Sequence, residues 1–388
     1  MVKNSLLLLA IASSTLPLLS GCGSSGSGNS AAPKALSAQA SLGEKIFKDT
    51  SLSASGVQAC STCHDPAFGH SPANANAVQA GDPAATQTGK RKTPGIRYLA
   101  TNTAFFFDDE GTPTGGFFWD GRADTPALQA KEPFVSPFEM ANADHASVIT
   151  KLAAATYAAE FKSVFGAGVF NDVEGAYLRM TLAIQAYEKE DSEFNSYTSK
   201  FDAFLAGKTS LSPQELNGFS LFNNPTKGNC AGCHPSSKGA DGSPPLFTDF
   251  TYDNLGVPRN PLIARNTDPA YFDLGICERF DPGTHEDLCG AFKVPSLRNV
   301  ALRKAFFHNG KFTSLVDALT FYVQRDTDPD KWYPPGQKFN DLPAKYQANV
   351  NTTEVPYNRS LGQAPALTDA EILDVVAFLN TLTDGFTQ

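Results

Sequence analysis

The pentapeptides CSTCH (60–64) and CAGCH (230–234) decide how this 388-residue chain is organised. Each follows the pattern C-x-x-C-H, in which the two cysteines bind the vinyl groups of a haem. The histidine that follows can then ligate the iron on its proximal side. A zinc site would need further ligands nearby, and a redox dithiol needs no histidine. The sequence therefore predicts two covalently bound haems c. The residues that hold them are Cys60, Cys63 and His64, and Cys230, Cys233 and His234.

The composition indicates a globular protein with room for two domains of ordinary size. Hydrophobic residues make up 41% of the chain and charged residues 18%, which is unlike a disordered protein. The formal net charge is −9 at pH 7. A nucleic-acid partner is therefore disfavoured, whereas a basic redox protein would be attracted.

The N-terminus is typical of an exported protein. Lys3 precedes an apolar run that is too short for an ordinary membrane helix. The run ends in LSGC (19–22), which resembles a bacterial lipobox and implies that Cys22 is lipidated. We therefore expect a lipoprotein-type signal peptide at 1–21 and a flexible Gly/Ser-rich tether at 22–40. An ordinary secretory signal with an unrelated cysteine is the alternative.

Both interpretations place the protein outside the cytoplasm, where disulfides persist. With a lipid anchor it faces the periplasm, the anchor is its only contact with a membrane, and the outer membrane is favoured. Of seven cysteines, Cys277 and Cys289 remain after the lipobox and the haem motifs. Pro282 and Gly283 make a turn between them, which predicts a disulfide, with two free thiols as the alternative.

The chain also repeats itself around the two motifs. Three pairs of segments correspond: LGEKIF (42–47) with LNGFSLF (216–222), KTPGIR (92–97) with KVPSLR (293–298), and FFWDGR (117–122) with FFHNGK (306–311). Such a repeat predicts an internal duplication, with one haem in each unit. Amphipathic helical patterns at 174–190 and 367–383 close the two units, and Thr368 is the expected N-cap of the second. The predicted fold is mainly α, with two cytochrome c-like domains at 41–205 and 206–388.

The far side of the second iron either carries a ligand or stays open for chemistry, and a methionine ligand would have to come from the first unit, across the domain boundary. The three methionines, Met1, Met140 and Met180, all precede the second unit. Ser314 predicts a helix that begins near residue 315 and places Tyr322 on its apolar face. A tyrosine there is usually a core residue. As a ligand, its phenolate would favour ferric and higher-valent iron.

The first unit carries residues suited to peroxide chemistry. Trp119 occupies the repeat position of His308, and Gln129 and Glu139 follow. A glutamate beside an open haem face can move a proton between the two oxygens of peroxide, and Gln129 could orient that peroxide. Without the haem motifs, Trp119 would be a core residue and Glu139 a surface residue. His70 is expected to support the proximal side or lie at the surface, with a distal iron ligand as the alternative, and His308 could bond a haem propionate or be structural.

The order of these motifs, together with PFEM (137–140), resembles the bacterial di-haem cytochrome c peroxidase and MauG family. The resemblance covers nearly the whole chain after the tether. It implies a peroxidatic haem in the first domain and an electron-transfer haem in the second. Tyr322 stands where the peroxidases carry an axial methionine and where MauG-type members carry tyrosine. The loop at 71–92 contains no histidine, which implies a five-coordinate first iron.

The resemblance implies a peroxidase that reduces hydrogen peroxide at the first haem and passes oxidising equivalents through Trp119 to the second. Its electrons would come from a small cytochrome c or cupredoxin. One alternative is MauG-like oxidation of a tryptophan or another aromatic residue on a partner protein. Another, from a different class, is a dihaem electron carrier without catalysis.

One residue departs from the family pattern. Family members bind calcium between the domains through an asparagine and main-chain carbonyl groups, whereas the aligned residue here is Lys92. Its ammonium could replace the ion among those carbonyls. A conventional calcium site is therefore doubtful, and the alternative is an exposed Lys92 with calcium bound through other ligands.

Overall fold

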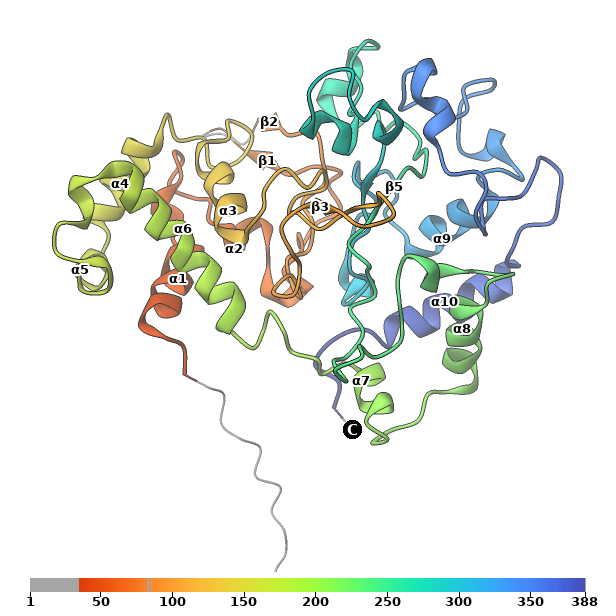
Figure 1. The fold of residues 1–388 in the computed structure, drawn as a ribbon, viewed down its shortest axis with the longest axis horizontal. Helices are drawn as coiled ribbons and strands as arrows, with labels where there is room; N and C mark the ends of the chain where they lie inside the picture. Colours follow the sequence, from red (N-terminus) through yellow and green to blue (C-terminus); the bar gives the residue numbers. More distant parts are fainter. Residues whose placement is uncertain (1–34, 82–83, 85, 388) are drawn as a thin grey trace, which may run out of the picture. The chain divides into compact units, whose positions relative to one another are not determined.

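Short helices and long loops make up most of the chain in the computed structural model, which describes residues 35–81, 84 and 86–387 (Figure 1). The predicted signal peptide and Cys22 lie outside these residues. Helix α1 begins at Ala38, with Ser37 as its N-cap. We therefore propose that the tether ends before residue 38 and not at residue 40.

The helices fall into two sets along the chain. The N-terminal half (36–199) contains α1 (Ala38–Lys48), α2 (Cys60–Cys63), α3 (Pro126–Val135), α4 (His145–Ala154), α5 (Ala158–Phe165) and α6 (Val173–Glu190). The C-terminal half (200–387) contains α7 (Lys200–Leu205), α8 (Pro213–Asn223), α9 (Leu315–Gln324) and α10 (Asp369–Asn380).

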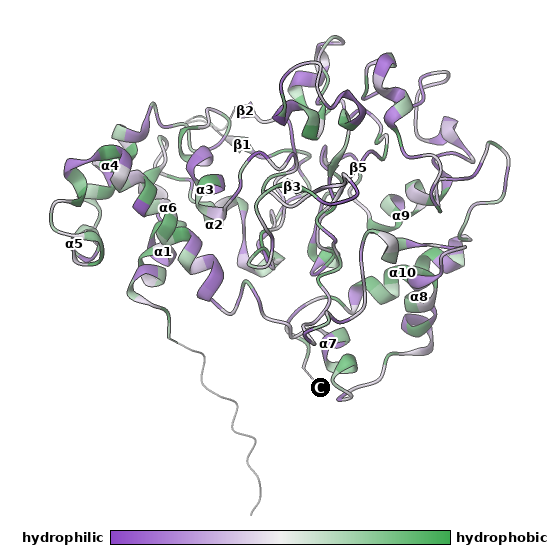
Figure 2. Ribbon diagram, in the orientation of Figure 1, coloured by the Kyte–Doolittle hydropathy of each residue, from purple (hydrophilic) through white to green (hydrophobic). Residues whose placement is uncertain are grey.

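Each half has its own hydrophobic cluster. The N-terminal cluster contains Phe47 of α1 and Met180 of α6, both nearly inaccessible to solvent. The C-terminal cluster contains Phe222 of α8 and Phe378 of α10. Helix α6 carries both hydrophobic and hydrophilic residues, as expected of a helix with one buried face (Figure 2). Phe201 of α7 belongs to the second cluster, so we propose a domain boundary just before α7 and not at 205/206.

The two halves repeat the same helix crossing. Helix α1 packs against α6, and α8 packs against α10. Gly43 and Gly218 lie at these crossings, where an added Cβ would come within 1.9 Å of the carbonyl oxygens of Ala183 and Asp374. Only glycine allows the paired backbones to approach so closely. These equivalent contacts are what the predicted duplication requires.

Small β-elements shape the loops between the helices. Three antiparallel pairs are formed, by β1 (Ala80–Gly81) and β2 (Gln87–Thr88), β3 (Phe106–Phe107) and β4 (Pro113–Thr114), and β5 (Tyr252–Asp253) and β6 (Phe292–Lys293). The corresponding segments FFWDGR and FFHNGK each form a turn closed by a single bridge. In both turns the second phenylalanine, Phe118 or Phe307, has a positive φ of 67° or 63°. This repeated conformation again relates the two halves.

Local signals in the sequence account for the helix starts. The side chain of Thr368 caps α10 and that of Ser314 caps α9, as the sequence predicts. Cys277 and Cys289 are joined by the predicted disulfide. Within the part of the chain that the structure describes, none of the helices combines the length and apolarity needed to cross a bilayer.

The glycine at the second crossing gives a test of this packing. Gly218→Ala should lower the free energy of unfolding by about 1–3 kcal/mol, because the Asp374 backbone leaves no room for a methyl group. Chemical denaturation followed by circular dichroism measures the effect. Gly168→Ala is the control, since its Cβ would meet only a side-chain nitrogen of Asn171, at 3.4 Å. Equal stability of the two variants would contradict this account.

Candidate active site

In both motif histidines, a hydrogen bond from Nδ1 orients the imidazole ring and leaves Nε2 for a metal. The Nδ1–H of His64 donates to the carbonyl oxygen of His70 (3.2 Å), and that of His234 donates to Phe247 O (2.8 Å). Burial lowers the pKa of each imidazole to about 4. A neutral ring with Nδ1 engaged in this way offers Nε2 as a ligand. Both histidines therefore fit the predicted proximal role.

A cavity of about 840 Å³ opens beside the second motif. Cofactor pockets commonly enclose roughly 300–1,000 Å³. Cys230, Cys233 and His234 line this cavity, and so do Trp119 and Tyr322. Its size and its mainly apolar wall fit a haem attached at residues 230–234.

Arg303 provides an independent test of whether haem fits. The guanidinium lines the same cavity and donates to the carbonyl oxygens of Ser296 and Arg298. Its Nε is buried without a hydrogen-bond partner, and the ion pairs among the described residues do not include Arg303. Burial lowers its pKa to about 10. An unpaired buried cation is suited to a haem propionate.

Tyr322 lies on α9 and faces this cavity, as its predicted role requires. Its ring packs against Phe307 at a centroid distance of 5.4 Å, and burial raises the pKa of its phenol. Ligation of iron by Tyr322 stays a prediction. Tyr357 was not predicted as a site residue. Its ring stacks on that of Tyr322 at a centroid distance of 5.9 Å, and the guanidinium carbon of Arg325 lies 4.6 Å from the centroid of Tyr357. Tyr357 belongs to a long loop without periodic pattern, so nothing local identifies it.

Trp119 reaches the cavity from the N-terminal half. Its indole N–H donates to Lys92 O (2.8 Å), and its own carbonyl oxygen accepts a hydrogen bond from Lys293 N (2.9 Å). Trp119 is therefore fixed at both its ring and its backbone. It lies where the two halves meet, as a relay between them would.

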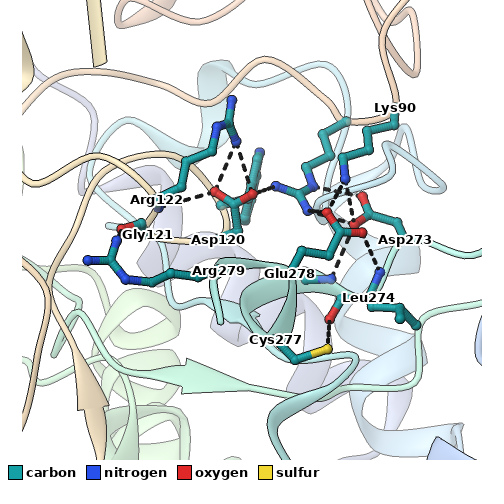
Figure 3. A network of polar contacts seen from close by, with 12 residues as sticks. Lys90, Asp120, Gly121, Arg122, Asp273, Leu274, Cys277, Glu278 and Arg279 are labelled. Carbon is teal, nitrogen blue, oxygen red and sulfur yellow. Dashed lines mark hydrogen bonds and ion pairs between the residues drawn. The ribbon is translucent and has the colours of Figure 1, made fainter. Parts of the chain in front are cut away.

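A buried ion-pair network holds the residue that follows Trp119 (Figure 3). Asp120 accepts from Arg91 and from Arg122, and Arg91 forms a bidentate pair with Asp273 at 2.6 and 2.7 Å. Although burial opposes ionisation, Arg91 and Lys90 hold the pKa of Asp273 well below its usual range. The network ties the Trp119 turn to the disulfide-bonded segment of the C-terminal half.

Glu139 lies in the loop after α3, close to the first motif. Burial raises the pKa of the Cys63 thiol to about 11, and the charge of Glu139 adds to this shift. Glu139 itself is solvent-exposed, yet desolvation by the surrounding protein raises the pKa of its carboxyl, although Ser136 and Arg122 act in the opposite direction. A Cβ at Gly81 of β1 would lie 2.2 Å from Glu139 N, so β1 supports this loop closely. Gln129 is half-buried on α3, and its contact with peroxide stays a prediction.

A second carboxyl group near the first motif was not predicted. Glu188 lies on α6, and burial raises its pKa to about 8. After burial, its charge makes the largest contribution to the raised pKa of Cys60. In the repeat, Glu188 corresponds to Leu379, which lines the second cavity. In the sequence it looks like an ordinary surface charge on an amphipathic helix.

The other two histidines near the motifs have structural partners. His70 is fully buried, and its Nδ1 accepts from Arg97 Nε (3.0 Å) while its carbonyl oxygen orients His64. It supports the proximal ligand, and the surface alternative is wrong. His308 is buried and stacks on Phe292 at 3.5 Å, at the edge of the cavity.

Several known proteins to which this chain is similar belong to one group, the di-haem peroxidases and MauG proteins. The family profile described as di-haem cytochrome c peroxidase matches residues 37–210. Methylamine utilization protein MauG of Paracoccus denitrificans is 36% identical over 358 residues, covering 89% of each chain. Cytochrome c551 peroxidase of Nitrosomonas europaea is 30% identical, over 72% of this chain and 71% of its own. The crystal structure of the diheme peroxidase BthA from Burkholderia thailandensis matches with a TM-score of 0.84 and 38% identity, covering 91% and 87% of the two chains. The predicted mainly α fold with two cytochrome c-like units is confirmed.

Arg303 gives a prediction specific to this cavity. Arg303→Gln removes a buried positive charge and should lower the reduction potential of the second haem by on the order of 50 mV. Arg303→Lys should retain most of the native potential, because it keeps the charge. Redox titration followed by visible absorbance measures both, and equal potentials in the native protein and both variants would contradict the assignment.

Proposed function

The chain belongs to the di-haem cytochrome c peroxidase and MauG family and carries two c-type haems, and from this premise we propose how its residues reduce hydrogen peroxide. The family membership makes the protein an oxidoreductase that acts on peroxide. The first haem, which Cys60, Cys63 and His64 would hold, would supply a binding site for peroxide and the electrons for cleavage of its O–O bond. Protein groups around that site carry out the proton and electron transfers.

Glu139 acts as the acid–base group of the first site. Its carboxylate takes the proton from the near oxygen of peroxide and returns it to the oxygen that leaves as water. The protein around Glu139 raises its pKa, which brings the carboxyl closer to the pH at which it can both accept and donate. Gln129 orients the bound peroxide by hydrogen bonding.

Trp119 and Tyr322 serve electron transfer between the two haem sites. Trp119 is held at the junction of the halves by the hydrogen bonds to Lys92 and Lys293. Tyr322 and His234 would together hold the iron of the second haem, and an anionic oxygen ligand there would favour the oxidised iron. The observation that carries this proposal is that Tyr322 and His234 line one cavity, which Trp119 also lines from the other half.

The electron donor is a small redox protein, a cytochrome c or a cupredoxin, attracted by the net charge of −9. The N-terminal unit is peroxidatic and the C-terminal unit transfers electrons. We place the protein on the periplasmic side of a membrane, held by the lipid on Cys22, with the outer membrane favoured.

A second candidate is oxidation of a tryptophan on a partner protein, as in MauG-type members. The tyrosine on α9 favours it, because such a ligand suits a site that stores oxidising equivalents. A simple electron carrier is the third candidate. It would show two low-spin haems by EPR, whereas this proposal requires one high-spin ferric haem in the isolated protein.

Tyr322→Met tests the second site. Exchange of an oxygen for a thioether ligand should raise the reduction potential of this haem by on the order of 100 mV or more and alter its low-spin EPR signal. The high-valent state formed with peroxide should decay faster. Tyr333→Phe is the control, since that buried phenol donates to Gly256 O and belongs to the same half. An unaltered low-spin signal in Tyr322→Met would remove Tyr322 as a ligand.

Glu139→Gln tests the first site. The rate of reaction with peroxide should fall by about 10²–10⁴-fold, because the amide cannot accept a proton. In the native protein the rate should fall as the pH drops through the raised pKa of this carboxyl, and the variant should lose that dependence. Stopped-flow absorbance provides both readings. Glu160→Gln, which alters an exposed ion pair with Lys45, should react normally. A native rate and pH profile in Glu139→Gln would exclude the role.

A further inference from the structure

Two lysines related by the internal repeat meet at the junction of the halves. Lys92 begins KTPGIR and Lys293 begins KVPSLR. Lys92 is only 5% exposed, and both lysines line the cavity that Trp119 shares with the second motif. Lysine is rarely buried in this way without a carboxylate partner.

The main chains of these lysines make reciprocal hydrogen bonds. Lys92 N donates to His308 O (2.7 Å), and Lys293 N donates to Trp119 O (2.9 Å). Trp119 and His308 occupy equivalent positions of the repeat. In each half, the main-chain N–H of the lysine therefore donates to a carbonyl oxygen of the other half, at the equivalent position held by Trp119 or His308. The junction has approximate two-fold symmetry in its contacts.

The two ammonium groups bond to main-chain oxygen atoms. Lys92 Nζ donates to Thr93 O (3.0 Å), and Lys293 Nζ donates to Gly116 O. Neither lysine takes part in the ion pairs found among the described residues. Carbonyl oxygens are also typical ligands of Ca²⁺. The ammonium groups thus have the kind of partner that a bound calcium would have.

The local charges disfavour an added divalent cation. Burial lowers the pKa of both lysines to about 7, and the positive charge of Arg303 lowers that of Lys92 further. Asp120, the carboxylate whose charge raises the pKa of Lys293, is already paired with Arg91 and Arg122. A calcium ion beside the two lysines would face these cations, and Asp120, which is held by two arginines, would offer it little compensation. The residues of the junction therefore do not fit calcium.

We propose that the side chains of Lys92 and Lys293 take the place of calcium between the two haem units, while the main-chain groups of the same two residues fix Trp119 by hydrogen bonds. Each ammonium is tethered to the chain, so its position does not depend on a dissociable ion. This role concerns the junction and stands apart from the proton transfer assigned to Glu139.

The calcium content of the native holoprotein is the first test. After dialysis against a calcium-free buffer, mass spectrometry of the metals should find iron but well below one calcium per chain. Treatment with EGTA should leave the EPR spectrum and the midpoint potentials of both haems unchanged. About one tightly held calcium per chain, with spectral changes on chelation, would overturn the proposal.

Two variants of Lys92 provide the second test. Lys92→Asn supplies an amide oxygen in place of the ammonium, and without calcium it should change the low-spin EPR signal and the potential of the second haem. Addition of 1 mM Ca²⁺, roughly the affinity range of weak calcium sites, should restore both. Lys92→Met should show the same change without rescue by calcium.

Lys304→Asn is the matched control, because Lys304 is an exposed lysine of the C-terminal half. It should match the native protein with and without calcium. Native spectra and potentials in calcium-free Lys92→Asn and Lys92→Met would overturn the cation role, and rescue of Lys92→Met by calcium would do the same. If Lys92→Asn does not fold, the metal content and EGTA response of the native protein still decide the matter.

Discussion

The arrangement of the site depends on the reciprocal main-chain hydrogen bonds that join the halves, Lys92 N to His308 O and Lys293 N to Trp119 O. Each half has its own hydrophobic cluster and needs a separate interaction to fix its position relative to the other. These bonds act at the residue that would relay electrons between the haem sites. The ion pairs of Arg91 with Asp120 and Asp273 cross the same junction and oppose its displacement.

Much of the fold could be predicted because its determinants are local. The two C-x-x-C-H motifs, the helix caps at Ser314 and Thr368, and the disulfide depend on short-range chemistry or on counting. Gly43 and Gly218 stand in corresponding segments of the repeat, so the two close helix crossings can be recognised as equivalent. The end of the tether and the domain boundary stay predictions, because Gly/Ser composition and loop length do not define where packing begins; the start of α1 and the packing of Phe201 favour slightly earlier positions.

The unpredicted site residues are those whose role depends on distant partners. Tyr357 stands out only as a neighbour of Tyr322, and Arg303 only because its buried Nε has no partner. Glu188 looks like a solvated helix residue until the fold encloses it near Cys60. Sequence periodicity reports the face of a helix, but it does not report which other segment covers that face.

The unpaired cations connect cofactor attachment with stability. Burial of a charge without a counter-ion is unfavourable, and Arg303, Lys92 and Lys293 all line one cavity. Each haem c brings two propionates, which are anions suited to such groups. We infer that Arg303, whose buried Nε has no partner, raises the free energy of the chain without haem and lowers it once the haems are attached. Its charge would then stabilise the holoprotein and, together with the two lysines that hold the junction together, set the electrostatic potential at the second haem.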